Sequence, residues 1–155
     1  MNQTSLGHTT RSLPEGMQRD ITKFRPNVVV SGATDEFCED YWRELSIASS
    51  NGPQSGKGTK ILLTQNCGRC VSLNLDYDTG DFATGEAGKM LAKLSKVRRV
   101  DAGAKYSPVF GRYGFLDKDA HGKCITVGDE VAVTGINAER TAFRKVYISG
   151  DVVVC

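Results

Sequence analysis

The chain has 155 residues, with 20 basic and 18 acidic side chains and a formal net charge of +2 at pH 7. This length suits one domain that buries a core without disulfide bonds, and the near balance of charge gives no reason to expect nucleic acid or an anionic membrane as the main partner. The five cysteines are an odd number, the N-terminus lacks a signal-peptide pattern, and no apolar run approaches the roughly 18 to 20 residues of a membrane span, so we expect reduced cysteines inside a cell.

The first part of the chain predicts little regular structure before one short strand. Residues 1–23 are polar with isolated apolar residues, which predicts a poorly packed lead-in. The three consecutive β-branched residues Val28–Val30 predict a buried strand. The acidic and aromatic segment 35–47 predicts one helical turn that leads into a short strand at Trp42–Ile47.

The centre of the chain places two cysteines inside a strand-like run. Cys67 and Cys70 form a C-x-x-C between the apolar run Ile61–Leu63 and the alternating segment Val71–Asp76. The thiols are therefore expected between strands or at a strand edge. This pattern does not offer the helix start after the second cysteine that a thioredoxin-like site requires.

The remaining elements alternate between one helix and several strands. Glu86–Val97 has apolar residues at three- and four-residue spacing and predicts an amphipathic helix, followed by the pair Arg98–Arg99 as solvated cations at its C-terminus. Segments 107–116 and 124–133 predict strands, and 146–154 is a candidate last strand. About five or six strands around one or two helices predict a β-rich α+β or barrel-like domain.

The cysteines admit three interpretations from the residues alone. Cys67, Cys70, His121 and Cys124 provide ligands for a zinc site, although one C-x-x-C is a weak signal and Cys124 begins an expected strand. Cysteines also serve as small buried hydrophobic residues. For Cys70 we favour an accessible thiolate, because Arg69 lies beside it in a glycine-containing loop.

Several blocks of sequence, taken together and in order, resemble the MOSC domain. This module lies at the C-terminus of molybdenum cofactor sulfurase and of the mitochondrial amidoxime-reducing component. The blocks are residues 24–32, 39–45, 66–80, 107–113 and 125–131. The resemblance implies a MOSC-type β-barrel with one or two helices that binds the molybdenum-pterin cofactor, Mo-molybdopterin.

The resemblance also implies how the chain divides. Residues 24–155 would form the MOSC core, with a tail that diverges from about residue 142. Residues 1–23 would be a remnant of upstream elements, because family members carry a further β-barrel domain ahead of the core. The resemblance therefore implies either a domain truncated at its N-terminus or a minimal relative with weakened cofactor binding.

The resemblance implies four site residues. Cys70 corresponds to the thiolate that binds molybdenum in the amidoxime-reducing branch, and so to the catalytic and metal-binding position. Arg25 and Asn27 correspond to residues that hold the phosphate of the cofactor, a task that suits a bidentate guanidinium and an amide donor. Tyr113 lies in a segment that lines the site in that branch.

In that branch the implied activity is the reduction of N-hydroxylated small molecules such as amidoximes, with electrons from a b-type cytochrome and its flavin reductase. Its location would be cytoplasmic or mitochondrial. In the sulfurase branch a separate pyridoxal-phosphate domain mobilises sulfur, and this chain is too short to contain one. Two alternatives remain open: a non-catalytic β domain stabilised by zinc or thiols, and a carrier of cofactor sulfur as a cysteine persulfide.

Overall fold

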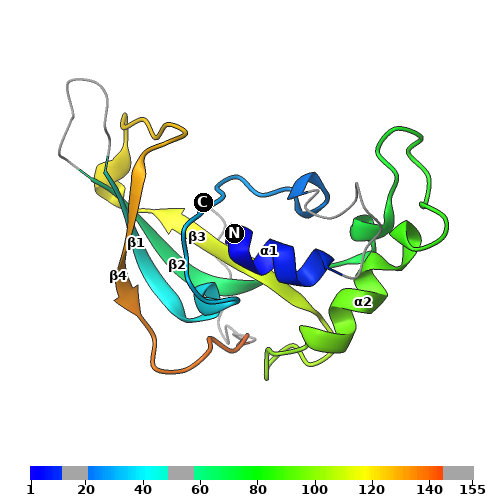
Figure 1. Cartoon of the computed structure of the whole chain (residues 1–155). Coiled ribbons are helices and arrows are strands. Elements are labelled where there is room, and N and C mark those ends of the chain that lie inside the picture. Colours follow the sequence, from blue (N-terminus) through cyan, green and yellow to red (C-terminus); the bar gives the residue numbers. More distant parts are fainter. Residues whose placement is uncertain (12–20, 49–57, 145–155) are drawn as a thin grey trace, which may run out of the picture.

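A computed structural model describes residues 1–11, 21–48 and 58–144, and its centre is an antiparallel sheet of four strands (Figure 1). The order across the sheet is β3-β2-β1-β4. The strands are β1 (Trp42–Ala48), β2 (Thr59–Gly68), β3 (Val109–Leu116) and β4 (Glu130–Ile136). The β-rich α+β class predicted from the sequence is confirmed, but the sheet is not closed into a barrel, since β3 and β4 remain its two edges within the described residues.

Both α-helices lie near the start of β3, away from β4 (Figure 1). The first helix, α1, spans Gln3–Thr10, and the second, α2, spans Met90–Val97 after a 3-10 turn at Ala87–Lys89. The predicted helix at 86–97 is therefore confirmed. Its buried residues Met90 and Leu94 are four positions apart, as expected for the inward face of an amphipathic helix.

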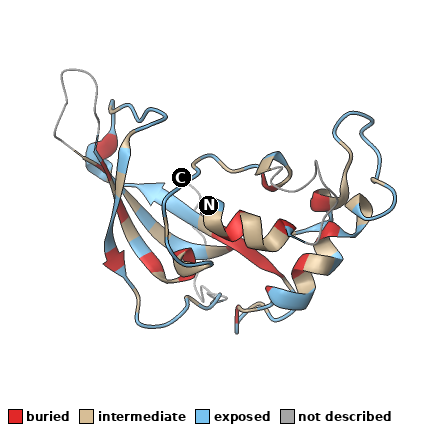
Figure 2. Ribbon diagram, viewed as in Figure 1, coloured by how far each residue is buried: buried red, intermediate tan, exposed pale blue. Residues whose placement is uncertain are grey.

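The core has two clusters of buried apolar side chains, and Figure 2 shows the buried positions concentrated where the helices meet the sheet. The larger cluster joins both helices to β3 through Leu6, Phe24, Leu73, Met90, Leu94 and Phe110. The smaller one joins β1 to the segment before it through Val30, Trp42 and Leu45. The helices and the sheet are thus held by one set of contacts, and the segment at residue 30 by another.

The N-terminal residues are packed, contrary to the expected loose lead-in. Asn2 caps α1, because its Oδ1 accepts a hydrogen bond from the backbone N–H of Thr4 at 3.1 Å. Ser5, Leu6 and Thr10 of this helix are buried. A short helix with few apolar residues is weak in isolation, so its stability comes from these tertiary contacts. Residues 12–20 of the expected lead-in lie outside the described residues.

The strand predicted at Val28–Val30 is wrong as a regular strand. Val30 forms one parallel bridge with Asn2, in which Val30 N–H donates to Met1 O at 2.8 Å and Gln3 N–H donates to Val30 O at 2.9 Å. Val29 is exposed. This pairing partner lies at the very start of the chain, where the sequence pattern gave no reason to expect one.

Two further strands predicted from the sequence are present, one as expected and one with a later start. The turn and strand expected at 35–47 are confirmed as a 3-10 turn at Cys38–Tyr41 followed by β1. The strand expected from residue 124 begins only at residue 130, because a tight turn precedes it: Thr126 N–H donates to Asp129 Oδ2 at 2.7 Å, and Gly128 has a φ of 99°. The candidate strand 146–154 lies outside the described residues.

A side chain from the 3-10 helix Val71–Asn74, which follows the cysteines, anchors the start of α2. The Oδ1 of Asn74 accepts a hydrogen bond from the backbone N–H of Leu91 at 2.9 Å, which pairs a donor that the first helical turn leaves free. We expect Asn74→Ala to lower the free energy of unfolding by about 1 kcal/mol. Thermal unfolding would show a decrease in midpoint, whereas Lys96→Ala on the exposed side of the helix should not. Equal midpoints for both variants would contradict the anchoring role.

Candidate functional site

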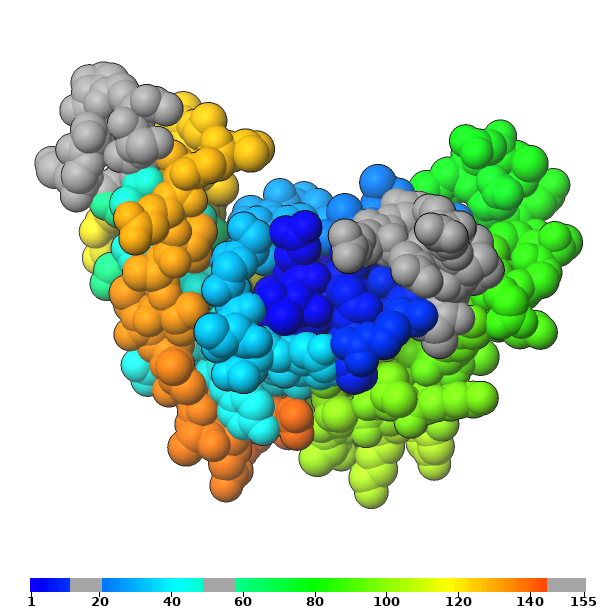
Figure 3. Space-filling model, in the orientation of Figure 1, coloured from blue at the N-terminus to red at the C-terminus, as the bar shows by residue number. Residues whose placement is uncertain are grey.

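A cavity of about 420 Å³ lies between the inner face of the sheet and the segment that crosses it at residues 24–30. Figure 3 shows the surface indented between the blue N-terminal residues and the yellow-orange segment near residue 125, both of which border the cavity. Arg25, Asn27 and Tyr113, three of the four predicted site residues, line it. Cys70 does not line it but directly follows Arg69, which does.

The rim of the cavity contains a strained backbone position. Arg25 has a φ of 48°, a left-handed conformation that residues with a side chain seldom adopt, and it is followed by Pro26. The backbone N–H of Arg25 donates to Thr22 O at 2.9 Å, which holds the turn. The side chains of Arg25 and Asn27 are exposed, so both are available to a molecule that enters the cavity.

Cys70 carries an exposed thiol that is biased toward the thiolate. It is the N-cap of a 3-10 helix at Val71–Asn74, so the expectation of no helical start after the C-x-x-C is wrong for a short 3-10 turn. The Sγ lies 3.2 Å from Ser72 Oγ. Hydrogen bonds from the side chain and the backbone of Ser72 lower the pKa of Cys70 below its ordinary value, and the charge of Arg69 adds a smaller effect in the same direction.

Cys67, in contrast, is a buried thiol at the end of β2 that lines the cavity. The interaction with Cys67 raises the pKa of Tyr113 above its ordinary value. The two cysteines of the C-x-x-C thus differ in environment. Cys67 and Tyr113 form part of the cavity wall, and Cys70 faces solvent next to it.

Arg69 joins the N-terminal segment to β3 rather than acting mainly on the neighbouring thiol. Its guanidinium donates from Nη1 to Phe24 O at 2.7 Å and from Nε to Phe110 O at 2.9 Å. Burial lowers the pKa of this arginine. The sequence correctly predicted that the pKa of Cys70 is lowered, but it attributed this to Arg69. The main cause is the hydrogen bond from Ser72.

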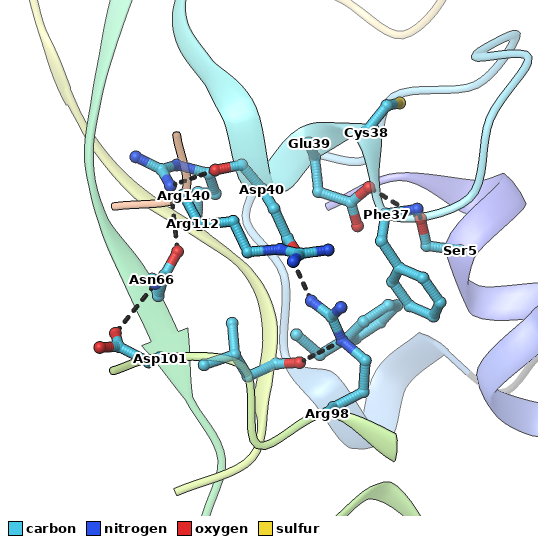
Figure 4. A network of polar contacts seen from close by, with 12 residues as sticks. Ser5, Phe37, Cys38, Glu39, Asp40, Asn66, Arg98, Asp101, Arg112 and Arg140 are labelled. Carbon is cyan, nitrogen blue, oxygen red and sulfur yellow. Dashed lines mark hydrogen bonds and ion pairs between the residues drawn. The ribbon is translucent and has the colours of Figure 1, made fainter. Parts of the chain in front are cut away.

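The buried carboxylate of Asp40, next in sequence to the cavity residue Glu39, binds side chains from distant parts of the chain (Figure 4). Asp40 is 1% exposed, and its Oδ1 is 2.7 Å from Nη2 of Arg98, whose side chain is only 2% exposed. Its Oδ2 accepts a hydrogen bond from Arg140 Nε at 3.0 Å. The expected solvated role of Arg98 is wrong: its guanidinium also lies over the ring of Phe37, 4.0 Å from the centroid.

Arg112 extends this network along the sheet. It donates to the backbone oxygen of Asp40 at 2.9 Å and to Oδ1 of Asn66 at 3.0 Å, and Asn66 in turn donates to Asp101 at 2.9 Å. These contacts fix β2, β3 and the turn before β1 relative to one another. They therefore set the shape of the cavity that these elements line.

The proposed zinc ligands are not brought together. No group of three or more His, Cys, Asp or Glu side chains that could hold a metal ion occurs in residues 1–11, 21–48 and 58–144, which include all four candidates. His121 and Cys124 are exposed in the loop before β4. In the same described segments, no helix is long and apolar enough to cross a membrane.

The contact between Cys70 and Ser72 predicts a measurable difference in thiol reactivity. A lowered pKa leaves more thiolate at neutral pH, and the rate of alkylation falls as the pH drops through that pKa. We expect Ser72→Ala to raise the pKa of Cys70 and to slow its alkylation by iodoacetamide at pH 7. Mass spectrometry of residue-specific labelling would measure the rates, with the exposed Cys124 as internal control. An unchanged rate for Cys70 would contradict this explanation.

Together these features define a β-rich domain that has a cavity against its sheet and an accessible thiol beside that cavity. The family model for the MOSC domain matches residues 1–132, and the chain belongs to that family. Mitochondrial amidoxime-reducing component 1 of Homo sapiens is 33% identical over 139 residues, which cover 87% of this chain and 36% of that protein. Mitochondrial amidoxime reducing component 2 of Rattus norvegicus is 35% identical over 112 residues, covering 70% and 28%.

A second group of relatives is also represented. Molybdenum cofactor sulfurase of Oryza sativa subsp. japonica is 32% identical over 80 residues, or 52% of this chain and 8% of that protein. The chain spans about a third of the length of the amidoxime-reducing components that it matches. These relatives support a domain related to the molybdenum cofactor.

The sequence analysis did not predict Glu39 and Arg112 as residues of the cavity lining. Both lie inside the blocks that carry the family resemblance, next to Asp40 and Tyr113. Their positions in those blocks were the only available signal. Nothing in the sequence pattern indicated that a glutamate next to an aspartate would be buried.

Proposed function

We propose that the chain is a molybdenum-cofactor-binding domain in which Cys70 is the thiolate ligand of molybdenum. The observation that carries this proposal is the exposed thiol of Cys70, whose pKa is lowered by Ser72. Metal ligation requires the thiolate, and a soft sulfur ligand suits a redox-active metal. Membership of the MOSC family supports the molybdenum cofactor as the group that this thiol would bind.

Arg25 and Asn27 are proposed to hold the phosphate of the cofactor. Both are exposed and line the cavity, and within residues 1–11, 21–48 and 58–144 neither side chain makes a hydrogen bond. A guanidinium and an amide both donate to phosphate oxygens, the guanidinium in a bidentate manner. Tyr113 is proposed as a further contact in the same cavity. The donors present therefore fit an anionic group at one end and a metal-bound thiolate at the edge.

The proposed reaction is the two-electron reduction of N-hydroxylated small molecules, with a b-type cytochrome and its flavin reductase as electron donors. When bound, the molybdenum-pterin cofactor supplies the redox chemistry. The residues of this chain hold the cofactor and shape the cavity. Support comes from the amidoxime-reducing relatives, whose names also place them in mitochondria. We propose a mitochondrial location, with the cytoplasm as the alternative.

The test is direct analysis of the chain produced in cells that synthesise the cofactor. We expect molybdenum and pterin to copurify in equal amounts, with about one of each per chain. Metal analysis and the fluorescence of the oxidised pterin measure the two components independently. A chain that remains free of both when cofactor is abundant would overturn the proposal. Reduction of a small amidoxime by the loaded chain would then test the activity.

A carrier of cofactor sulfur is the second candidate, favoured by the match to molybdenum cofactor sulfurase. The same exposed thiolate of Cys70 would hold the transferred sulfur as a persulfide. Mass spectrometry after incubation with a persulfide donor would detect a single added sulfur on Cys70. If no such product forms while molybdenum binds, the carrier function is excluded.

A further inference from the structure

The half-buried side chain of Arg69 binds two backbone oxygens that belong to different parts of the chain. Its Nη1 donates to Phe24 O at 2.7 Å, its Nε donates to Phe110 O at 2.9 Å, and its Nη2 donates to the same Phe110 oxygen. The backbone N–H of Arg69 also donates to Pro108 O at 2.8 Å. This residue therefore joins the loop of the C-x-x-C, the start of the segment that crosses the sheet, and β3.

Each of these three parts carries a residue that is proposed to contact the cofactor. Cys70 directly follows Arg69 in the loop, and Arg25 directly follows Phe24 in the crossing segment. Tyr113 lies on β3, whose backbone the same guanidinium binds. The guanidinium is therefore placed where it fixes the proposed metal end of the site relative to the proposed phosphate end.

The crossing segment, residues 24–30, is held at its two ends. Its first and last residues, Phe24 and Val30, are buried, and alternate residues between them are exposed. The Val30 end is fixed by its bridge to the first residues of the chain. The Phe24 end is fixed by Arg69 and by the ring of Phe110, whose centroid lies 4.6 Å from that of Phe24. Loss of Arg69 would therefore loosen the end of the segment that carries the proposed phosphate ligands.

We propose that Arg69 is a positioning residue, which holds the thiolate of Cys70 and the phosphate-binding side chains at the separation that one cofactor molecule bridges. A ligand that contacts two sites on one protein gains affinity from the second contact only if the sites are held at a distance that it can span. A preorganised site also loses less entropy when the ligand binds. The identity of the bridging ligand rests on the proposed function, whereas the anchoring of the crossing segment by Arg69 does not.

The first test measures the anchoring by hydrogen exchange in the chain without cofactor. Arg69→Ala should speed exchange of the Arg25 N–H at least about tenfold, because a loosened segment lets the bond from this N–H to Thr22 O open. The N–H of Arg98, which bonds to Leu94 O at the end of α2, is the internal reference for a change in overall stability. Equal acceleration of both amides, or none at Arg25, would overturn the proposal.

The second test observes Arg69 in the unmodified protein. A guanidinium held by three hydrogen bonds to backbone oxygens should have an Nε–H that exchanges with water at least about tenfold more slowly than that of the exposed Arg99. NMR of the arginine side chains would measure both rates. An Nε–H of Arg69 that exchanges as fast as that of Arg99 would contradict the anchoring, even if Arg69→Ala fails to fold.

The third test determines whether the anchoring matters for the cofactor. In cells that synthesise the cofactor, Arg69→Ala should retain at least about tenfold less molybdenum and pterin than the wild type. Arg69→Lys keeps the charge but replaces the rigid fork of donors by one flexible ammonium, so we expect most of the loss to remain. Wild-type contents in either variant would overturn the positioning role.

The fourth test separates positioning from a general loss of stability by a double-mutant cycle. A residue that acts by placing Cys70 loses its effect once Cys70 can no longer bind, so the two replacements should be strongly non-additive. In the Cys70→Ser background, Arg69→Ala should therefore change the pterin content by less than about twofold. Asn74→Ala, which lies outside the cavity lining, should lower stability without this coupling. Additive losses for Arg69→Ala and Cys70→Ser would contradict the positioning role.

These outcomes distinguish a failure of the inference from a failure of the proposed function. A wild-type chain that takes up no cofactor would overturn the proposed function and, with it, the positioning role of Arg69. A wild-type chain that is loaded, together with an equally loaded Arg69→Ala, would overturn the positioning role alone.

Discussion

Replacing Asp40 with alanine is expected to lower the free energy of unfolding by about 3 to 5 kcal/mol. The carboxylate of Asp40 is the ion-pair partner of Arg98, and both side chains are almost fully buried. Removing it leaves the guanidinium of Arg98 in the core without its counter-charge, and breaking a buried pair from one side is far more damaging than deleting an exposed pair. Urea unfolding followed by the fluorescence of Trp42 would measure the difference.

Arg140→Ala is the matched comparison for this prediction. Arg140 bonds to the other oxygen of the same carboxylate, but its side chain is 41% exposed. Its loss should therefore lower stability by no more than about 1 kcal/mol. Equal, small losses of stability in Asp40→Ala and Arg140→Ala would contradict this prediction. The hydrogen bond of Arg98 to Val109 O and its position over the ring of Phe37 would then be enough to stabilise its buried charge.

Replacing Cys70 with serine is expected to reduce bound molybdenum at least about tenfold, because a serine hydroxyl stays protonated at neutral pH and is a harder ligand than a thiolate. The fold should be retained, since Cys70 is exposed and substitutions at such positions usually change stability by less than about 0.5 kcal/mol. Metal analysis of purified protein, with circular dichroism on the same samples, would separate loss of ligand from loss of fold.

Cys124→Ser serves as the control for this variant. Cys124 is likewise exposed, and it lies outside the cavity lining. Its replacement should leave the molybdenum content at the wild-type level. Full retention of molybdenum by Cys70→Ser would show that Cys70 is not the ligand. Cys67, the buried thiol in the cavity wall, would then be the next candidate ligand.

Local patterns predicted the elements whose stability depends on a regular apolar face. The helix at residues 86–97 was recognisable because its buried residues Met90 and Leu94 lie four positions apart, close to the period of a helix. The family resemblance, in turn, indicated Arg25, Asn27 and Tyr113, and these three residues line one cavity. Their roles toward a cofactor stay predictions.

The features that escaped prediction depend on partners far away in the sequence. Among the residues that the structure describes, the segment Val28–Val30 pairs with Met1–Gln3 alone, so its β-branched composition did not suffice to make it a strand. Arg98 reads as a surface cation because its partner Asp40 lies 58 residues earlier. The lowered pKa of Cys70 depends on the hydroxyl of Ser72. A 3-10 helix brings this hydroxyl close to the thiol, and no periodic pattern in the sequence predicts that helix.

The pairing of β1 with β4 has a consequence for the order in which this chain can fold. Ala48 pairs with Glu130, and Asp40 bonds to Arg140 across 100 residues. Contacts of such long range require a large loss of chain entropy before they form, which slows folding. During synthesis, the antiparallel pair β1 and β2 can form early, whereas the sheet edge and the bond from Arg140 must wait for the last part of the described chain. Until then β1 is an open edge, and a nascent chain at this stage would be the one most in need of a chaperone.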